Sequence, residues 1–259
     1  MNAYWKLAVA CLFISVKLNS VAQDTQNTEM VRTERGFVES TTATYTVDPG
    51  GELTIDADFG NVRIETSANS RVEILIEKQL EGGTEEQARR AFDEVEVTTE
   101  QQGNDVHIRI DKKRWLSFKG NKVSVAMTVQ VPYTYDLDIN TAGGSIEIAD
   151  LGGEIMAKTA GGSIRIGATK GEVNARTLGG SIRIGPTEGG VYAKTLGGSI
   201  DIGDTKGDVS ALTMGGSIRV GRTEGDLTAY TMGGNIIVEA ASGKVSAKTL
   251  GGKVRVGST

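Results

Sequence analysis

The second half of the chain repeats with a period of 18 residues, and this repeat constrains the fold more than any other feature. Gly-Gly pairs begin at positions 143, 161, 179, 197, 215, 233 and 251, with no insertion between them. The consensus of one unit is G-G-S-I-R-I-G-x-T-x-G-x-V-x-A-x-T-L. A fixed period of this kind predicts a solenoid, in which each unit forms one coil and packs on its neighbours.

Each unit contains two short strand patterns. Ile164 and Ile166 flank the charged Arg165, and the residues from Val173 to Thr177 alternate in the same way. Alternation with a period of two is typical of half-buried β-strands. Glycines separate the two patterns, as expected at corners that need a positive φ or a close approach between chains. The sequence therefore predicts an all-β dominated fold, with a two-sheeted β-solenoid of 18-residue coils over residues 141–259.

An alanine and a threonine recur at fixed positions of the coil. The alanines stand opposite a column of isoleucine or valine, where a small residue lets the two sheets pack closely, so we expect a thin core. The threonines are expected to form a hydroxyl ladder along the solenoid axis. The alanine column runs from Ala157 to Ala247, and the threonine column from Thr159 to Thr249.

The residues before the repeat have mixed patterns. Residues 37–140 alternate mostly with a period of two, which predicts a β-rich section continuous with the solenoid. One helix is expected near 84–95, because Thr84-Glu85-Glu86-Gln87 matches a capping box and apolar residues follow at helical spacing. Residues 23–36 are polar and aperiodic, and they are expected to form a mobile lead-in.

The N-terminus has the pattern of a secretory signal peptide over residues 1–22. Lys6 precedes an apolar run from Leu7 to Val16, and Ser20-Val21-Ala22 supplies a small-residue cleavage site. Cleavage after Ala22 removes Cys11, the one cysteine, which follows Ala-Val-Ala and would otherwise be a candidate lipidation site. We therefore expect export to the periplasm, the cell surface or the medium. Because the apolar run is too short to span a bilayer, stable membrane insertion is not expected.

The charge of the chain bears on its partners. The sequence has 28 basic and 33 acidic residues, a net charge of −5. Loss of the signal peptide would remove two of the lysines and make the net charge more negative. No polybasic block offsets this balance, so a nucleic-acid partner is not expected.

Three segments together resemble a known bacterial family. They are Gly50–Ile64, the segment VSVAMTVQVPYTYDLDINTAGGSIEI and the later TLGGSIRI repeats. In this order they resemble the β-strand-repeat putative adhesin family, also called the Toastrack domain, over nearly the whole mature chain. The resemblance implies an exported or membrane-proximal β-solenoid with a role in adhesion or envelope stress. The family has no established catalytic residues, so none is carried over to this chain. The chain departs from those members that a transmembrane helix tethers.

The residues do not assemble a catalytic set. His107 is the one histidine and lies on the polar face of a strand pattern, and the serines beside the Gly-Gly pairs lack a base. We therefore expect no enzyme activity, no catalytic residue and no cofactor. The enzymatic alternative is a polysaccharide-active β-helix, but the outward columns of the coils do not bring two acids together.

Two calcium patterns and an ice-binding pattern are further alternatives. A calcium β-roll would need a carboxylate where each coil has isoleucine or valine. The run Asp136-x-Asp138-x-Asn140-Thr141, followed by Glu147, matches EF-hand ligand positions, but the turn glycine is replaced and the flanking residues alternate as strands. Threonine columns suit ice binding, but these threonines share a face with alanine and valine. We expect no metal site.

Two surface features remain as candidates. Tyr192, Leu212 and Tyr230 are expected to lie near one another on adjacent coils, and such a patch suits sugar or protein contacts. Lys253 and Arg255 are expected to protect the final strand edge from self-association by charge. Together these features predict a non-enzymatic exported cell-envelope protein that acts as a binding or adhesion scaffold through its solenoid surface, with an envelope glycan or protein as partner.

Overall fold

The computed structural model describes residues 27–113 and 123–257. The predicted signal peptide and Cys11 lie outside these residues. The described part of the chain contains no helix with the length and apolar character needed to cross a bilayer.

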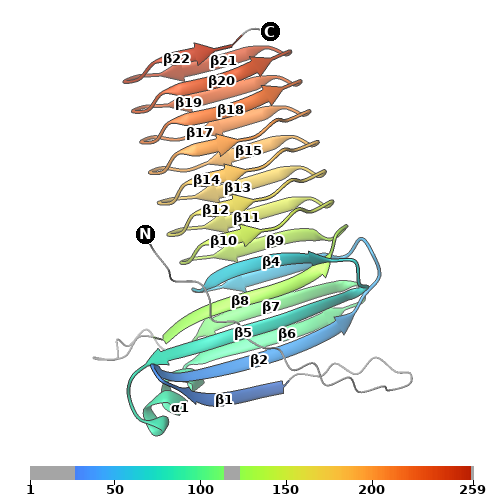
Figure 1. Ribbon diagram of the computed structural model, residues 1–259, viewed down its shortest axis with the longest axis vertical. Coiled ribbons are helices and arrows are strands. Elements are labelled where there is room, and N and C mark those ends of the chain that lie inside the picture. Colours follow the sequence, from blue (N-terminus) through green and yellow to red (C-terminus); the bar gives the residue numbers. More distant parts are fainter. Residues whose placement is uncertain (1–26, 114–122, 258–259) are drawn as a thin grey trace.

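The first part of the described chain has eight strands and one helix (Figure 1). The helix α1 spans Glu85–Asp93, between the fifth and sixth strands. The strands are β1 Asn27–Thr33, β2 Gly36–Thr46, β3 Glu52–Ala57, β4 Asn61–Ser67, β5 Arg71–Glu81, β6 Val95–Gln102, β7 Asp105–Lys112 and β8 Val123–Pro132.

The second part is a stack of coils with two short strands each, rising from the first part toward the C-terminus (Figure 1). The first strands of the coils are β9 Asp136–Thr141, β11 Ile155–Thr159, β13 Val173–Thr177, β15 Val191–Lys194, β17 Val209–Leu212, β19 Leu227–Thr231 and β21 Val245–Thr249. The second strands are β10 Ile146–Ile148, β12 Ile164–Ile166, β14 Ile182–Ile184, β16 Ile200–Ile202, β18 Ile218–Thr223, β20 Ile236–Ala241 and β22 Val254–Val256.

These strands form two sheets that face each other across one core. The first sheet has the order β1-β2-β5-β8-β4-β10-β12-β14-β16-β18-β20-β22, and the second has the order β21-β19-β17-β15-β13-β11-β9-β3-β7-β6. Strands of successive coils pair in parallel and in register, so that Ile164 pairs with Ile146 on one side and Ile182 on the other. The prediction of an all-β dominated, two-sheeted solenoid is confirmed.

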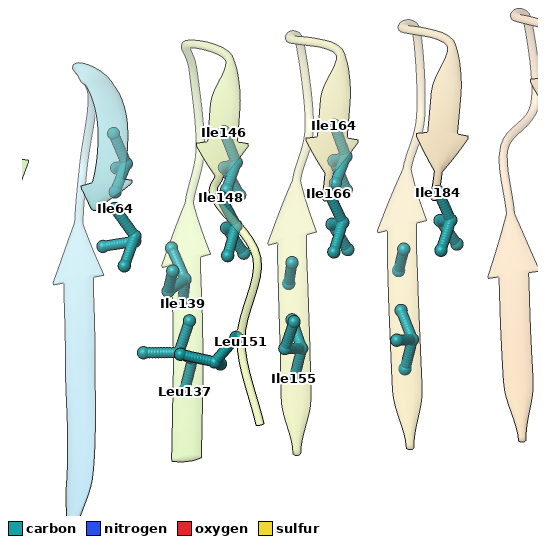
Figure 2. Packing of buried hydrophobic residues seen from close by; sticks show 14 of the residues in the cluster. Ile64, Leu137, Ile139, Ile146, Ile148, Leu151, Ile155, Ile164, Ile166 and Ile184 are labelled. Atoms are coloured by element: carbon teal, nitrogen blue, oxygen red, sulfur yellow. The ribbon is translucent and has the colours of Figure 1, made fainter. Parts of the chain in front are cut away.

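The in-register pairing makes each repeat position a column. Figure 2 shows Ile146 and Ile148 of one coil beside Ile164 and Ile166 of the next, with Leu137 and Ile155 on the opposite sheet. The alanine column fills the space between the sheets, and Ala175 and Ala193 are fully buried. Because a methyl group occupies little space, the sheets pack closely, as expected from the sequence.

One further coil, made of β3 and β4, precedes the 18-residue repeat and stacks on its first coil. Leu53 of β3 is in register with Leu137 of β9, and Val62 of β4 is in register with Ile146 of β10. Residues 68–135, which include α1 and β5 to β8, separate this coil from the next one along the chain. Both sheets therefore run from the first part into the repeat without a break.

The helix covers a second, smaller core. Thr84 caps α1 in the predicted capping box, with Gln87 N donating to Thr84 Oγ1 at 3.3 Å and Thr84 N donating to Gln87 Oε1 at 2.9 Å. Ala88 and Phe92 are buried against Phe37 and Leu80 of β2 and β5. The apolar stripe of the helix thus covers a sheet, as its spacing predicts.

The expectation of a mobile lead-in over residues 23–36 is wrong from Asn27 onward, and residues 23–26 lie outside the described residues. Asn27–Thr33 form β1, which pairs antiparallel with all of the first half of β2. The alternation that predicts a strand is missing because β1 is an edge strand and most of its side chains are exposed. Backbone pairing with β2, together with packing of Met30 on the small core, holds the segment in the sheet.

The expected hydroxyl ladder is also wrong, because the threonines bond to glycine backbone instead. Thr195 Oγ1 donates to Gly180 O of the preceding coil at 2.8 Å and accepts from Gly198 N of its own coil at 3.3 Å. The same pair of bonds recurs through the column from Thr159 to Thr249. Each buried threonine therefore ties the Gly-Gly corner of its coil to the corner below.

Close approach explains most of the corner glycines. Gly144 has a φ of +119°, which favours glycine for its backbone conformation. At Gly180 the φ is not in the left-handed region, but an added Cβ would collide with the carbonyl group of Gly162 in the preceding coil. A Cβ added at Gly179, the first glycine of the same pair, would have its nearest neighbouring atom, the carbonyl oxygen of Gly161, at 3.5 Å.

We expect Gly180→Ala to destabilise the solenoid and Gly179→Ala to leave its stability nearly unchanged. The first change forces two coils apart and lowers the free energy of unfolding by about 1–3 kcal/mol. The second change adds a methyl group at ordinary contact distance, with an effect within about 0.5 kcal/mol. Denaturant unfolding of both variants measures the difference, and equal stabilities would contradict the close-approach explanation.

The ionisation of Tyr135 should make the free energy of unfolding depend on pH in the alkaline range. The side chain is fully buried and its hydroxyl donates to Asn104 O. Burial raises the pKa of Tyr135 to about 12, and the carboxylates of Asp105 and Asp48 act in the same direction. Because the folded pKa lies above the ordinary value of about 10, the folded state holds the proton more tightly than the unfolded state.

The contribution of Tyr135 should be complete below about pH 10 and disappear as the pH rises through 12. Over this range we expect the wild-type protein to lose about 2–3 kcal/mol of unfolding free energy from this group. Tyr135→Phe should be less stable at neutral pH, since Asn104 O loses its donor, but should lose less stability between pH 10 and 12. Denaturant titrations at several pH values test this, and parallel losses in both proteins would contradict it.

Candidate binding surface

Two outward columns of the second sheet carry the predicted patch. In-register pairing places Tyr192 beside Asn174 and Ser210, and places Leu212 between Lys194 and Tyr230. Leu212 and Tyr230 are thus direct neighbours, whereas Tyr192 lies in the adjacent column, one coil below Leu212.

The environment of Tyr192 differs from that of the other two. The guanidinium carbon of Arg176 lies 4.8 Å from the centre of the Tyr192 ring, in cation–π contact. All three patch residues are half-buried. The structure therefore places Leu212 and Tyr230 together, and pairs Tyr192 with an arginine of the preceding coil.

Tyr192 also lines an open groove on the second sheet. The groove has a volume of about 460 Å³ and crosses the outer face of β9, β11, β13 and β15. Its side chains combine carboxylates with one amide, one thioether and one aromatic ring. They are Glu52, Asp136, Asp138, Glu154, Met156, Glu172, Asn174 and Tyr192.

The EF-hand pattern does not form a loop. Asp136, Asp138 and Asn140 lie along β9, and Asp136 Oδ1 accepts from Glu154 N at 2.7 Å. Glu147 lies beyond the corner on β10, where its carboxylate pairs with Arg63 at 2.8 Å. Within residues 27–113 and 123–257, no group of three or more histidine, cysteine or acidic side chains could hold a metal ion.

The single histidine and the serine column have strand and corner positions. His107 lies on β7 in register with Thr54 and Glu100. Each serine after a Gly-Gly pair accepts a backbone hydrogen bond from the next coil, as when Ser181 N donates to Ser163 Oγ at 3.2 Å. These bonds give the serines a structural role at the corner.

The structure also reveals an exposed apolar column that the sequence patterns did not single out. It occupies the last repeat position, between the buried threonine and the Gly-Gly pair, and we call it the corner ridge. Its exposed fractions lie between 38% at Leu196 and 65% at Leu250. The ridge consists of Leu178, Leu196, Met214, Met232 and Leu250. Continued alternation would have indicated it, because the preceding threonine points inward.

Lys253 and Arg255 lie at the outermost strand of the first sheet. Arg255 is in register with Ile237 of β20, and Lys253 N donates to Asn235 Oδ1 at 2.8 Å. Both side chains are exposed, as are Val254 and Val256 beside them.

The fold and this surface define a class of protein: a two-sheeted β-solenoid with open grooves on its outer faces. The chain belongs to the Toastrack DUF4097 family, whose model matches residues 50–254. The resemblance stated from the sequence is confirmed. No curated protein matches the chain in sequence.

The solved structures that align with this chain include two bacterial putative adhesins. A putative adhesin of Bacteroides fragilis NCTC 9343 aligns with a TM-score of 0.54 and 17% identity, over 83% of this chain and 96% of that one. A putative adhesin of Parabacteroides distasonis ATCC 8503 aligns with a TM-score of 0.43 and 12% identity, over 85% and 97%. The similarity to the Bacteroides protein shows a shared fold.

Proposed function

We propose that this chain is a non-enzymatic, exported protein of the cell envelope that binds an extended glycan in the groove on its second sheet. The observation that carries the proposal is the placement of Tyr192 in an open groove together with carboxylate and amide side chains. An aromatic ring offers an apolar face for a sugar, and carboxylate or amide oxygens accept hydrogen bonds from its hydroxyl groups.

The shape of the groove favours a polymer. Its lining residues come from β3 to β15, which are five successive rungs of the second sheet. At about 4.8 Å per rung the groove extends for roughly 19 Å along the solenoid axis. A chain of several sugars can lie along such a surface without entering an enclosed pocket.

The comparisons support binding at the coarser level. The Bacteroides fragilis relative of this fold is described as a putative adhesin, and membership of the Toastrack family is consistent with a surface role. The signal-peptide pattern of residues 1–22 supports the exported location that we propose. The finer part of the proposal, a glycan held in this groove, rests on the groove itself.

Tyr192→Ala should weaken glycan binding by roughly tenfold, from loss of about 1–2 kcal/mol of ring contact. Tyr230→Ala is the matched control, because Tyr230 lies two coils away and does not line the groove. A glycan array followed by calorimetry measures both variants. If both variants lost glycan affinity, the contact would extend over the patch of Tyr192, Leu212 and Tyr230. Unchanged affinity in both variants would refute glycan binding at the groove and at the patch.

We also propose that Lys253 and Arg255 prevent pairing of the outer strand β22 with another copy. Charged side chains on an edge strand oppose β-sheet extension. Replacement of both residues by valine should therefore raise self-association, measured by sedimentation at increasing protein concentration. Lys206→Val, at a corner away from β22, is the control. An unchanged mass distribution in the double variant would show that these charges do not protect the edge.

A further inference from the structure

We propose that the Gly-Gly corner of the solenoid is a peripheral membrane-binding edge, which lays the coil stack along a bilayer containing anionic phospholipid. The two features that define this surface, the corner ridge and a groove on the first sheet, contribute no residue to the lining of the glycan groove. Two independent features carry the inference: the apolar corner ridge and a groove on the first sheet whose lining includes serine and arginine side chains.

The corner ridge is a continuous row on a fixed backbone. Leu196 N donates to Leu178 O, and Met232 N donates to Met214 O, both at 3.3 Å, so the ridge positions of neighbouring coils stack directly. The buried threonine before each ridge residue fixes the corner and leaves the ridge side chain pointing outward. Five side chains at about 4.8 Å spacing make a row roughly 19 Å long.

The ridge stands clear of its surroundings. The next residue in each coil is a glycine such as Gly197 or Gly215, which is exposed and adds no side chain. The leucine and methionine side chains of the ridge therefore project from a corner that has no neighbouring side chain in the sequence. A contiguous row of exposed leucine and methionine on a solenoid with otherwise mostly polar outward columns is typical of a surface that another apolar phase covers.

A groove along the first sheet runs beside the ridge and suits phosphate groups. It has a volume of about 540 Å³, and its polar lining consists of serine and arginine side chains of successive coils, the carboxylates of Glu147 and Asp201, and Asn235. Each serine oxygen already accepts a backbone N–H, as Ser199 Oγ does from Ser217 N at 3.3 Å, so its own proton remains to be donated. Arg165 and Arg219 add guanidinium donors, which match phosphate geometry, whereas Arg183 pairs with Asp201.

Basic side chains flank the ridge on both sheets. The second sheet contributes a column that contains Lys158, Arg176, Lys194 and Lys248. The two acids in the arginine column are neutralised, since Glu147 pairs with Arg63 and Asp201 pairs with Arg183. At the opposite corner acids predominate, among them Glu172, Glu188, Asp204, Asp208, Glu224 and Asp226. An anionic surface therefore attracts the ridge side and repels the opposite corner.

A bilayer fits this combination better than a second copy of the chain. Pairing two ridges would bring the basic columns of both copies together, and a single row of side chains covers far less than the roughly 800 Å² per partner of a stable interface. An anionic bilayer satisfies both features at once. Its phosphates face the arginines and serines, and its acyl boundary receives the leucine and methionine side chains.

Flotation with lipid vesicles tests the proposal. The protein without residues 1–22, the expected signal peptide, should bind vesicles of equal parts phosphatidylglycerol and phosphatidylcholine, and bind phosphatidylcholine vesicles far less. The triple variant Leu196→Ser/Met214→Ser/Met232→Ser should lose roughly tenfold or more of its affinity, since three large apolar side chains are no longer buried. Val31→Ser, at an exposed apolar residue of β1 that lines neither the ridge nor the glycan groove, is the control and should bind as the wild type does.

A second pair of variants tests the contribution of the arginine charges to vesicle binding. Arg165→Gln/Arg219→Gln should weaken binding to phosphatidylglycerol vesicles and reduce its sensitivity to salt. Lys170→Gln/Lys206→Gln removes the same charge from the opposite corner and should have no such effect. Addition of soluble glycerol phosphate should compete weakly, and full displacement by it would overturn the bilayer in favour of a free phosphate ligand.

A fluorescent label reports the orientation independently of affinity. In the protein without residues 1–22, which has no cysteine, an environment-sensitive dye at Met214→Cys should shift to the blue when vesicles bind, while the same dye at Lys206→Cys should not. Equal binding to both vesicle types, unchanged binding of the triple variant, or equal dye shifts at both positions would overturn the proposal. A ridge-dependent dimer in sedimentation would overturn it in favour of a second copy.

Discussion

Parallel, in-register pairing between successive coils is the constraint on which the rest of the structure depends. It requires the backbones to approach closely at the corners, and that approach is possible because residues such as Gly180 have no side chain to meet the carbonyl below. The buried threonines then fix the corner by bonding to the glycine carbonyl of one coil and the glycine N–H of the next turn, as at Thr195. Packing of isoleucine, valine and alanine between the sheets follows from this geometry.

The same pairing determines the chemistry of the surface. Since each repeat position becomes a column, a preference for one residue type at one position becomes a line of that chemistry along the molecule. Lysine and arginine columns, the serine column and the corner ridge arise in this way. Departures from the consensus then create local sites, as where Tyr192 replaces a small polar residue and meets Arg176. A solenoid of this kind thus combines extended columns of one chemistry with local departures from them.

Much of the fold could be predicted from the sequence, but less of the candidate surface could. The two strands per coil, the buried alanine column and the capped helix follow from local alternation and spacing. The groove at Tyr192 could not be predicted, because its lining includes Glu52, which is distant in sequence from the repeat. The segment Asn27–Thr33 lacked a strand pattern because its stability comes from the backbone of β2 rather than from its own side chains.

The sequence by itself determined the coil, since every unit encodes its own inward and outward residues by alternation with glycine corners. Tertiary structure alone decided which distant segments join the stack. Leu53 and Leu137 become neighbours although 84 positions separate them, and periodicity carries no information about a register across such an insertion. Tertiary structure also decided that Thr195 bonds to glycine backbone. A buried hydroxyl group needs a hydrogen-bond partner, and the packed coils place the carbonyl oxygen of Gly180 within reach. The exposure of Leu196 and Met214 follows from the same corner geometry.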